Sequence, residues 1–229
     1  TICYDENITA FSNVISPSGG SGSYGHQWQI QPGCSGTWSD ISGANSSIYA
    51  HPTSLTQTTC FRRLITDLCG TTYSDTVTIT VYPQLNVSFS GLATYYCMSN
   101  DTVILTGTPN GGTFSGNGIA GNIFYPMQAG VGNHSITYSY TDTNLCTSTE
   151  TQIVEVKGMS AVNFSGLDTA YCMGDPTVQL TGNPSGGTFT GTGTNGTTFN
   201  PTTAGAGTHT VTYTYINSYS CVDSISQSI

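Results

Sequence analysis

The chain has 229 residues, a formal net charge of -9 at pH 7 and only 7% charged residues. Its basic residues are Arg62, Arg63 and Lys157, too few to neutralise a run of phosphates, which excludes nucleic acid and anionic membrane surfaces as partners. No apolar run reaches the roughly 18 residues of a membrane-spanning helix, so we expect no membrane insertion. Thr, Ser, Asn, Tyr and 28 glycines are abundant, and no stretch has the spacing of an amphipathic helix. We therefore predict an all-β chain.

Residues 1–83 form the first predicted domain, which closes in the strand-like stretch "SDTVTITVYP". The stretch "YGHQWQI" places Trp28 in the middle of a strand, where an immunoglobulin-like domain has its core tryptophan. The stretch "TTCFRRLITDLCGTTYSDTVTITVYP" predicts the last strands, with a short turn at residues 67–70.

Arg62 and Arg63 are neighbours in one of these strands, so their side chains must face opposite sides. At most one of them faces the core, where a buried charge needs a carboxylate such as Asp40. A structural ion pair is favoured over a ligand-binding arginine at this position.

A repeat organises the rest of the chain. Residues 89–146 align on residues 164–221 without a gap, for example "LTGTPNGGTF" on "LTGNPSGGTF". We predict two copies of one domain, copy 1 at residues 84–157 and copy 2 at residues 158–229. Short β-branched and aromatic segments alternate with Gly, Pro, Asn and Asp turns, and "ITYSY" places Ile136, Tyr138 and Tyr140 on one face. The predicted fold class is three tandem immunoglobulin-like antiparallel β-sandwich domains, stapled by disulfides and without significant helix.

The two copies differ at the end of their last predicted strand. In copy 1, "TSTETQIVEVKG" follows Cys146, whereas only "VDSISQSI" follows Cys221 in copy 2. We expect the natural chain to continue past Ile229, because an incomplete edge strand exposes unpaired backbone groups.

Three stretches match the spacing G-x-G-x-x-G of a dinucleotide-binding loop. That motif needs a strand before it and a helix after it, whereas these stretches are followed by short segments such as "NIFYP" and "TTFNP". We interpret the glycines as turn residues between strands, and we expect no cofactor. The matches are Gly20-Gly22-Gly25, Gly116-Gly118-Gly121 and Gly191-Gly193-Gly196.

Eight cysteines in small β domains are typical of disulfides formed outside the cell. Because the copies are equivalent, we predict one bond within each copy, which stabilises a small domain by about 4 kcal/mol in the loop-entropy model. In the first domain, Cys3 and Cys69 occupy the same topological ends as Cys97 and Cys146. This analogy selects a bond between Cys3 and Cys69 and leaves Cys34 and Cys60 as the second pair. The predicted pairs are Cys97–Cys146, Cys172–Cys221, Cys3–Cys69 and Cys34–Cys60.

The chain shows no sign of a catalytic or metal site. Its acidic residues are dispersed, there is no G-x-S-x-G elbow, and the cysteines and the four histidines lack the close spacing of zinc ligands. His134 and His209 are equivalent in the two copies, which favours a shared structural role. The linkers "YPQLN" and "EVKGMSAVN" hold one glutamate, too few oxygen ligands for calcium. We expect no enzyme and no metal.

Two long stretches resemble the immunoglobulin-like repeats of giant cell-surface adhesins of Bacteroidetes. The first is "YGHQWQIQPGCSGTWSDISGANSSIYAHPTSLTQTTCFRRLITD", with its W-x-D-I-x-G-A and F-R-R motifs, and the second combines G-G-T-F with Y-T-D-x-N-x-C. The resemblance is closest to flavobacterial gliding-motility adhesins of the SprB type. It implies an extracellular, cell-surface protein exported by type IX secretion, whose partners are neighbouring repeats and surface polysaccharide or abiotic surfaces.

The same resemblance implies O-glycosylation, which in such relatives occurs at Asp-Thr or Asp-Ser followed by a small apolar residue or Thr. This chain offers four such triplets, "DTV" twice, "DTA" and "DSI". Their candidate acceptor residues are Thr76, Thr102, Thr169 and Ser224; ordinary strand-edge sequence accounts for the triplets equally well.

Three functions remain open at this point. The leading one is a structural stalk or adhesive segment of a long surface adhesin, with repeats stacked end to end. The alternative is a carbohydrate-binding module, in which exposed aromatic residues of the first domain, Trp38 or Tyr24, stack on sugar rings. A third is an accessory region of an enzyme whose catalytic domain lies elsewhere in the parent chain.

Overall fold

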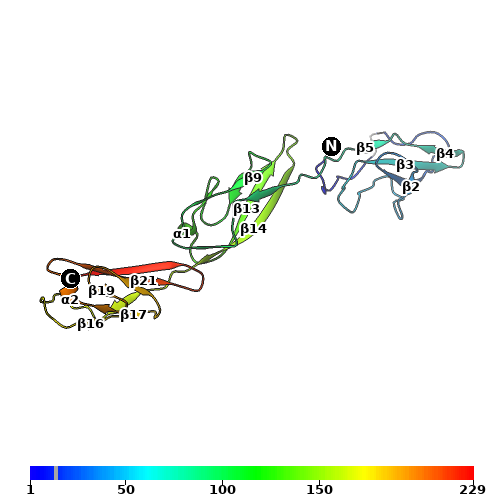
Figure 1. Cartoon of the computed structure of the whole chain (residues 1–229). Coiled ribbons are helices and arrows are strands. Elements are labelled where there is room, and N and C mark those ends of the chain that lie inside the picture. Colours follow the sequence, from blue (N-terminus) through cyan, green and yellow to red (C-terminus); the bar gives the residue numbers. More distant parts are fainter. Residues whose placement is uncertain (13–14) are drawn as a thin grey trace. The chain divides into compact units, whose positions relative to one another are not determined.

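The computed structural model describes residues 1–12 and 15–229. Within these residues the chain is built of β-strands, and its only helices are the single turns α1 (Pro126–Ala129) and α2 (Pro201–Ala204) (Figure 1). Each turn begins with a proline, whose fixed φ suits the first helical position, and each is followed by a glycine. The prediction of an all-β chain is confirmed.

The chain forms two compact units. Unit 1 holds Thr1–Asn86 together with Thr141–Ser148, and unit 2 holds Val87–Tyr140 and Thr149–Ile229. Unit 1 therefore contains region 1 (residues 1–83) and one hairpin tip from copy 1. The buried residues form three separate hydrophobic cores, one in region 1 and one in each copy of the repeat. The division into three domains at residues 83 and 157 stays a prediction.

Region 1 is organised around one antiparallel sheet of order β2-β1-β3-β4, in which β5 also pairs with β3. The central strands are long and half-buried, and their register places Trp28 opposite Arg63. The strands are β1 (Gly25–Pro32), β2 (Ser39–Asp40), β3 (Thr59–Asp67), β4 (Gly70–Tyr73) and β5 (Val77–Ile79).

Trp28 is the centre of the core of region 1, as predicted. Its side chain is 5% exposed, and its ring stacks on Phe11 and Tyr49 with centroid distances of 5.5 and 5.8 Å. Its indole N–H donates to the carbonyl of Ser46 at 2.9 Å, so the polar atom of the buried ring is satisfied. The fully buried Phe61 lies on the facing strand β3.

The two neighbouring arginines point to opposite faces, and only Arg63 faces the core. Arg63 is 5% exposed, and its Nη1 donates to the carbonyl of Ser47 at 2.8 Å. Asp40, the carboxylate expected beside the core-facing arginine, instead accepts a hydrogen bond of 2.7 Å from Gln29 on the solvent face. The expected role of Asp40 was therefore wrong, because the pleat of β1 places Gln29 and its partner on the opposite face from Trp28.

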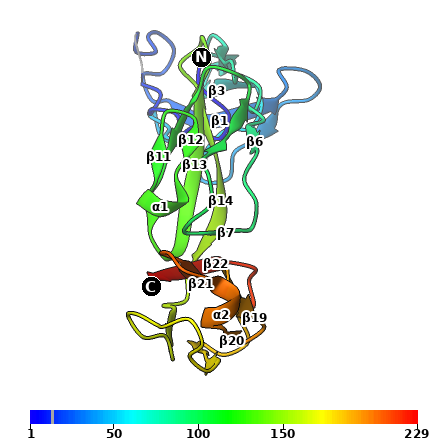
Figure 2. The ribbon, with the colours of Figure 1, turned by 60° about the vertical axis from the view of Figure 1, so that its left-hand side comes forward.

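Copy 1 has a four-stranded sheet of order β10-β13-β14-β7 and two smaller sheets, β11-β12-β8 and β6-β9. The hairpin of β13 and β14 is its longest element, and Figure 2 shows the two strands running side by side. Ile136 and Tyr138 are fully buried on β13 while Thr137 and Ser139 face outward, as the alternation predicts. The strands are β6 (Ser88–Ser90), β7 (Tyr95–Cys97), β8 (Val103–Ile104), β9 (Thr106–Thr108), β10 (Thr113–Ser115), β11 (Ile119–Ala120), β12 (Ile123–Phe124), β13 (Gly132–Thr141) and β14 (Thr147–Lys157).

Copy 2 repeats this architecture with equivalent residues. Its sheets have the orders β18-β21-β22, β16-β20-β19 and β15-β17, and it has no counterpart of β7 in the described residues. The strands are β15 (Asn163–Ser165), β16 (Val178–Gln179), β17 (Thr181–Asn183), β18 (Thr188–Thr190), β19 (Thr194–Asn195), β20 (Thr198–Phe199), β21 (Thr210–Ile216) and β22 (Val222–Ser228).

One tyrosine ties the glycine-rich turns of each copy to its core. In copy 1 the hydroxyl of Tyr138 donates to the carbonyl of Pro109 and accepts the N–H of Gly112 at 2.9 Å. In copy 2 the hydroxyl of Tyr213 makes the same two bonds, to Pro184 and from Gly187. This shared corner explains why the G-G-T-F stretch recurs with the domain.

The glycines of the G-x-G-x-x-G stretches serve turns. Gly118 has a φ of +76°, and a Cβ there would lie 2.7 Å from the carbonyl oxygen of Tyr125. Gly121 has a φ of +62°, which L-residues rarely adopt. A strand and not a helix follows each stretch of the repeat, β12 in copy 1 and β20 in copy 2. The interpretation as turn residues is confirmed for the glycines of the two repeat stretches and for Gly20 and Gly22, which all have positive φ, whereas Gly25 is the first residue of strand β1.

Candidate functional site: the cysteine junctions

The structure pairs the cysteines differently from the prediction. Cys34–Cys60 forms as expected within region 1, with 5.0 Å between its Cα atoms. The other two bonds each join two different regions of the sequence, with Cα–Cα distances of 5.5 Å, and they are Cys3–Cys146 and Cys97–Cys221. Cys69 and Cys172 are free and exposed. The predicted pairs Cys3–Cys69, Cys97–Cys146 and Cys172–Cys221 were therefore wrong.

Strand geometry explains why a bond within copy 1 cannot form. Cys97 lies on β7 opposite Lys157, the last residue of β14, whereas Cys146 immediately precedes Thr147, the first residue of β14. The two cysteines are thus at opposite ends of an 11-residue strand, about 36 Å apart at roughly 3.3 Å per residue. A disulfide requires Cα atoms within about 7 Å.

Three of the cysteines begin a tight turn, which we call a socket loop. In each, the cysteine N–H donates to the side chain three residues later, and the N–H of that residue donates back to the cysteine carbonyl. These reciprocal bonds hold the cysteine backbone in one position, in the manner of a local side-chain cap. The socket loops are Cys3–Glu6 in region 1, Cys97–Asn100 in copy 1 and Cys172–Asp175 in copy 2.

Three other cysteines lie in the turn of a β-hairpin, which we call a tip hairpin. The Asp or Asn that opens each turn accepts the cysteine N–H through its side-chain Oδ1, at 2.8 Å for Cys69, 2.9 Å for Cys146 and 3.0 Å for Cys221. The three turns connect β3 to β4, β13 to β14 and β21 to β22. The tip hairpins are Asp67–Cys69 in region 1, Asp142–Cys146 in copy 1 and Asn217–Cys221 in copy 2.

Both inter-region disulfides join a tip hairpin to the socket loop of the preceding region. The junction at Cys97–Cys221 carries further contacts within unit 2. The Nζ of Lys157 lies 3.9 Å from the ring centroid of Tyr219 and 2.7 Å from a carboxylate oxygen of Glu155. The hydrogen bond to Glu155 raises the pKa of Lys157, with a contribution from Tyr219. The junction is therefore a small interface and more than a single covalent bond.

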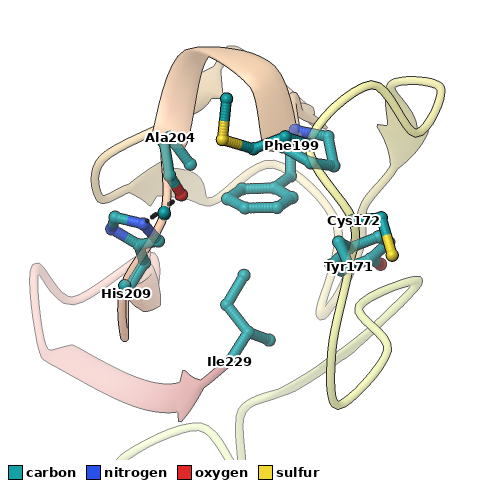
Figure 3. Close-up of a pocket in the computed structure, with 11 residues that line it drawn as sticks. Tyr171, Cys172, Phe199, Ala204, His209 and Ile229 are labelled. Atoms are coloured by element: carbon teal, nitrogen blue, oxygen red, sulfur yellow. Dashed lines mark hydrogen bonds between the residues drawn. The ribbon is translucent and has the colours of Figure 1, made fainter.

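The two free cysteines lie in a socket loop and a tip hairpin that are not joined, although Cys69 lies two residues after Asp67, whereas Cys146 and Cys221 lie four residues after Asp142 and Asn217. Cys172 lies at a cavity of about 260 Å³ in copy 2. Figure 3 shows Cys172 and Tyr171 across this cavity from His209, with the sulfur of Cys172 pointing away from its centre. Cys69 lies at a cavity of about 390 Å³ in region 1. In copy 1 the corresponding loop is covered by the end of β14, where Lys157 lies opposite Cys97.

The two repeat histidines have the shared structural role that their equivalence predicts. The Nε2 of His134 lies 2.7 Å from the carbonyl oxygen of Gly130, and that of His209 lies 2.9 Å from the carbonyl oxygen of Gly205. Each bond links the histidine, in β13 for His134 and just before β21 for His209, to the glycine after the short helix, α1 or α2. In the described residues, no group of three or more His, Cys, Asp or Glu side chains is placed to hold a metal ion.

The aromatic side chains expected to face solvent in region 1 are half-buried and engaged by other residues. The guanidinium of Arg62 lies between Trp38 and Tyr73, 4.3 and 3.9 Å from their ring centroids, and its Nε donates to Gln29. One face of Trp38 is thus covered by a cation. The hydroxyl of Tyr24 donates to the carbonyl of Gly19. Trp38 contacts Arg62 and Tyr24 contacts Gly19, and in the described part of the chain the two rings make no contact with each other that would form one sugar-binding platform.

The four candidate glycosylation residues are all exposed. Thr76, Thr102, Thr169 and Ser224 lie at the surface of region 1, copy 1 and copy 2. Among the described residues, no helix combines the length and the apolar character needed to cross a membrane.

Comparisons with known proteins give one family profile and several solved structures of low similarity. A family profile described as a domain of unknown function (DUF8696) matches residues 1–83. No curated protein matches the sequence. Solved structures with similarity include a Ca²⁺-stabilised adhesin with which an Antarctic bacterium binds ice, at 13% identity and a TM-score of 0.31. The alignment covers 92% of this chain and 66% of that one.

Two further structures are similar at the same level. One is a 1.5-MDa bacterial ice-binding adhesin, at 11% identity and a TM-score of 0.29, covering 92% of this chain and 86% of that one. The other is the N-terminal eight immunoglobulin domains of the Down syndrome cell adhesion molecule, at 10% identity and a TM-score of 0.28, covering 99% of this chain and 39% of that one. At these scores the similarity carries no functional argument.

Proposed function

We propose that this chain is a non-catalytic stalk segment of a long cell-surface adhesin, made of three domains at residues 1–83, 84–157 and 158–229. The observation that carries the proposal is the overlap of the two inter-region disulfides. Cys3–Cys146 and Cys97–Cys221 enclose sequence loops that share residues 97–146, so together they brace nearly the whole chain. Such overlapping bonds limit how far a chain can be extended by a pulling force, which is the property that a stalk requires.

The overlap limits how far the chain can be extended. With both bonds intact, the shortest covalent path enters at Cys3, passes to Cys146, returns to Cys97 and leaves from Cys221. About 60 residues of this path are free to stretch, which corresponds to roughly 200 Å at ~3.4 Å per residue. Reduction of the bonds releases all 229 residues, or roughly 780 Å.

Single-molecule pulling between the two termini tests the proposal. We expect complete unfolding of the oxidised chain to lengthen it by no more than roughly a quarter of the contour length of the reduced chain. The variant Cys34→Ser with Cys60→Ser is the matched control, because that bond lies within region 1, off the shortest path. Extension of the oxidised chain to the full reduced length would show that the brace is absent and would remove the basis of the stalk.

A role in gliding motility, export by type IX secretion and glycosylation are finer proposals that rest on the resemblance to Bacteroidetes repeats. Glycans on Thr76, Thr102, Thr169 and Ser224 would add hydration to a surface with few charges and block edge-to-edge pairing. Mass spectrometry of protein from its own organism tests this directly, since unmodified peptides at all four positions would exclude it.

The alternative function is a carbohydrate-binding module that uses Trp38. The cation–π contact with Arg62 occupies one ring face, so a sugar must stack on the other face or displace the guanidinium. The variant Trp38→Ala distinguishes the two functions. Its binding to cell-surface polysaccharide is compared with that of the wild-type chain. Loss of binding in this variant favours the module, and unchanged binding or no binding in either protein favours the stalk.

A further inference from the structure

Among the residues that the structure describes there are three socket loops and three tip hairpins, joined by two disulfide junctions. The tip of copy 1 is joined to the socket of region 1, and the tip of copy 2 is joined to the socket of copy 1. One socket, at Cys172 in copy 2, and one tip, at Cys69 in region 1, are left with free, exposed thiols. These two thiols are at the two ends of the series.

We propose that Cys172 and Cys69 are the open ends of the same disulfide ladder. Cys172 bonds to the tip cysteine of a further domain of this kind, and Cys69 bonds to the socket cysteine of another. The inference rests on the proposed stalk function and deepens it, because it names the partner: a domain whose hairpin carries an Asp or Asn before its cysteine. The stalk is thereby continued covalently in both directions.

The occupied junctions of this chain are the direct support. Cys97 stands at the position equivalent to Cys172, begins the same socket loop, and is bonded to a tip cysteine. Copy 1 therefore shows the socket of copy 2 in its joined form. Cys97 is 8% exposed in that form, whereas Cys172 is exposed.

The sockets accept tips across domain types, which matters for Cys69. Region 1 and copy 1 have different folds around their sockets, yet both bind the tip hairpin of a repeat. What the two sockets share is the turn closed by a Glu or Asn side chain. What the three tips share is a cysteine N–H that donates to the Asp or Asn side chain opening the turn, two residues earlier for Cys69 and four residues earlier in the two joined tips.

The bond-forming chemistry requires an oxidant, which we name as a disulfide such as oxidised glutathione. The thiolate of Cys172 attacks one sulfur of oxidised glutathione and releases one glutathione thiolate, leaving a mixed disulfide. The thiolate of a tip cysteine then attacks the Cys172 sulfur and releases the second glutathione. Two thiols are oxidised to one disulfide, and one glutathione disulfide is reduced to two thiols.

A second copy of this chain is the probe, because it offers the free tip Cys69 to the free socket Cys172. Head-to-tail contacts of this kind do not close on themselves and give open chains. The variant Cys172→Ser keeps only the tip thiol, and Cys69→Ser keeps only the socket thiol. Each variant is incubated with oxidised glutathione by itself, and the two variants are also incubated together at a ratio of one to one. Dimers are then counted on non-reducing gels.

We expect the mixture to form the Cys69–Cys172 heterodimer at least about tenfold faster than either variant forms a homodimer, which corresponds to about 1.4 kcal/mol of tip-to-socket recognition. Asp67→Ala in the Cys172→Ser chain removes the cap on the Cys69 N–H and should slow heterodimer formation about fivefold. The double variant Cys69→Ser with Cys172→Ser should stay monomeric. Peptide mapping that finds Cys3–Cys146 and Cys97–Cys221 intact shows that the variants are folded.

Homodimers that form as fast as the heterodimer would overturn the inference, because they would indicate unselective oxidation of exposed thiols. The absence of any dimer would overturn it as well. Either result leaves the pulling experiment untouched, since that experiment depends only on the two bonds inside the chain. A failure of the ladder is therefore distinguishable from a failure of the stalk.

Discussion

Copy 1 and copy 2 have the same fold from equivalent residues, and yet Cys97 and Cys172 end in different states. Cys97 lies on β7, paired with the end of β14, and is bonded to Cys221. Cys172 lies in a loop outside any strand and is a free thiol. The residues that pair with β7 in copy 1 are Glu155–Lys157, and the positions equivalent to them in copy 2 lie beyond Ile229. The comparison is therefore between a socket with its partner strand and a socket without one, whereas each copy has a core of its own.

The largest expected effect comes from removing the junction bond while leaving both copies intact. Cys97→Ser with Cys221→Ser opens a sequence loop of 124 residues. The loop-entropy model predicts a loss of about 4–5 kcal/mol in the free energy of unfolding of unit 2. Urea unfolding followed by near-ultraviolet circular dichroism measures it.

Cys172→Ser is the matched control for that variant. Its side chain is exposed and free, so the free energy of unfolding should change by less than about 0.5 kcal/mol. A loss as large as that of the junction variant would mean that Cys172 has a role within copy 2, and the comparison between the copies would fail.

The second expected effect sharpens the claim that each copy depends on its own core. Tyr138→Phe and Tyr213→Phe each remove a hydroxyl that bonds to a proline carbonyl and to a glycine N–H. We expect each variant to lose about 1–3 kcal/mol, because buried polar partners are left unsatisfied. Urea unfolding measures both losses, which should agree within about 0.5 kcal/mol.

The half-buried Tyr140 offers the control for these two variants, since Tyr140→Phe changes the same chemistry away from the glycine turns. A loss at Tyr138 with none at Tyr213 would contradict the equivalence of the two corners.

The smallest expected effect concerns pH and contrasts region 1 with the copies. Burial lowers the pKa of His26 and His51 in region 1, and the charge of Arg63 adds to the effect at His26. A histidine whose folded pKa is lowered stabilises the fold above its unfolded pKa, about 6.5, and this stability is lost as the pH falls through and below that value. Region 1 should therefore unfold more easily at pH 5 than at pH 7.

Thermal unfolding followed by Trp fluorescence reports on region 1, because both tryptophans lie there. His26→Gln with His51→Gln should reduce the difference between pH 5 and pH 7. An undiminished difference in that variant would assign the pH dependence to other groups.

Some features follow from the sequence because they depend on local chemistry. The alternation in "ITYSY" places Ile136 and Tyr138 in the core, and the strand around Trp28 buries the ring as expected. The absence of a helix after each glycine stretch identifies turns. The pair Cys34–Cys60 is correct, but it was predicted only as the remainder after Cys3–Cys69, and that assignment was wrong.

The junctions were decided by tertiary structure alone. An offset of 75 residues requires only that equivalent cysteines behave alike, and bonds within each copy meet that condition as well as bonds from each copy to the preceding region. The choice depends on where each cysteine lies along β14. Cys97 is placed at one end by parallel pairing with Lys157, and Cys146 at the other by the hairpin turn. Long-range pairing of this kind leaves no local signal, because the two strands that meet are 60 residues apart in the chain.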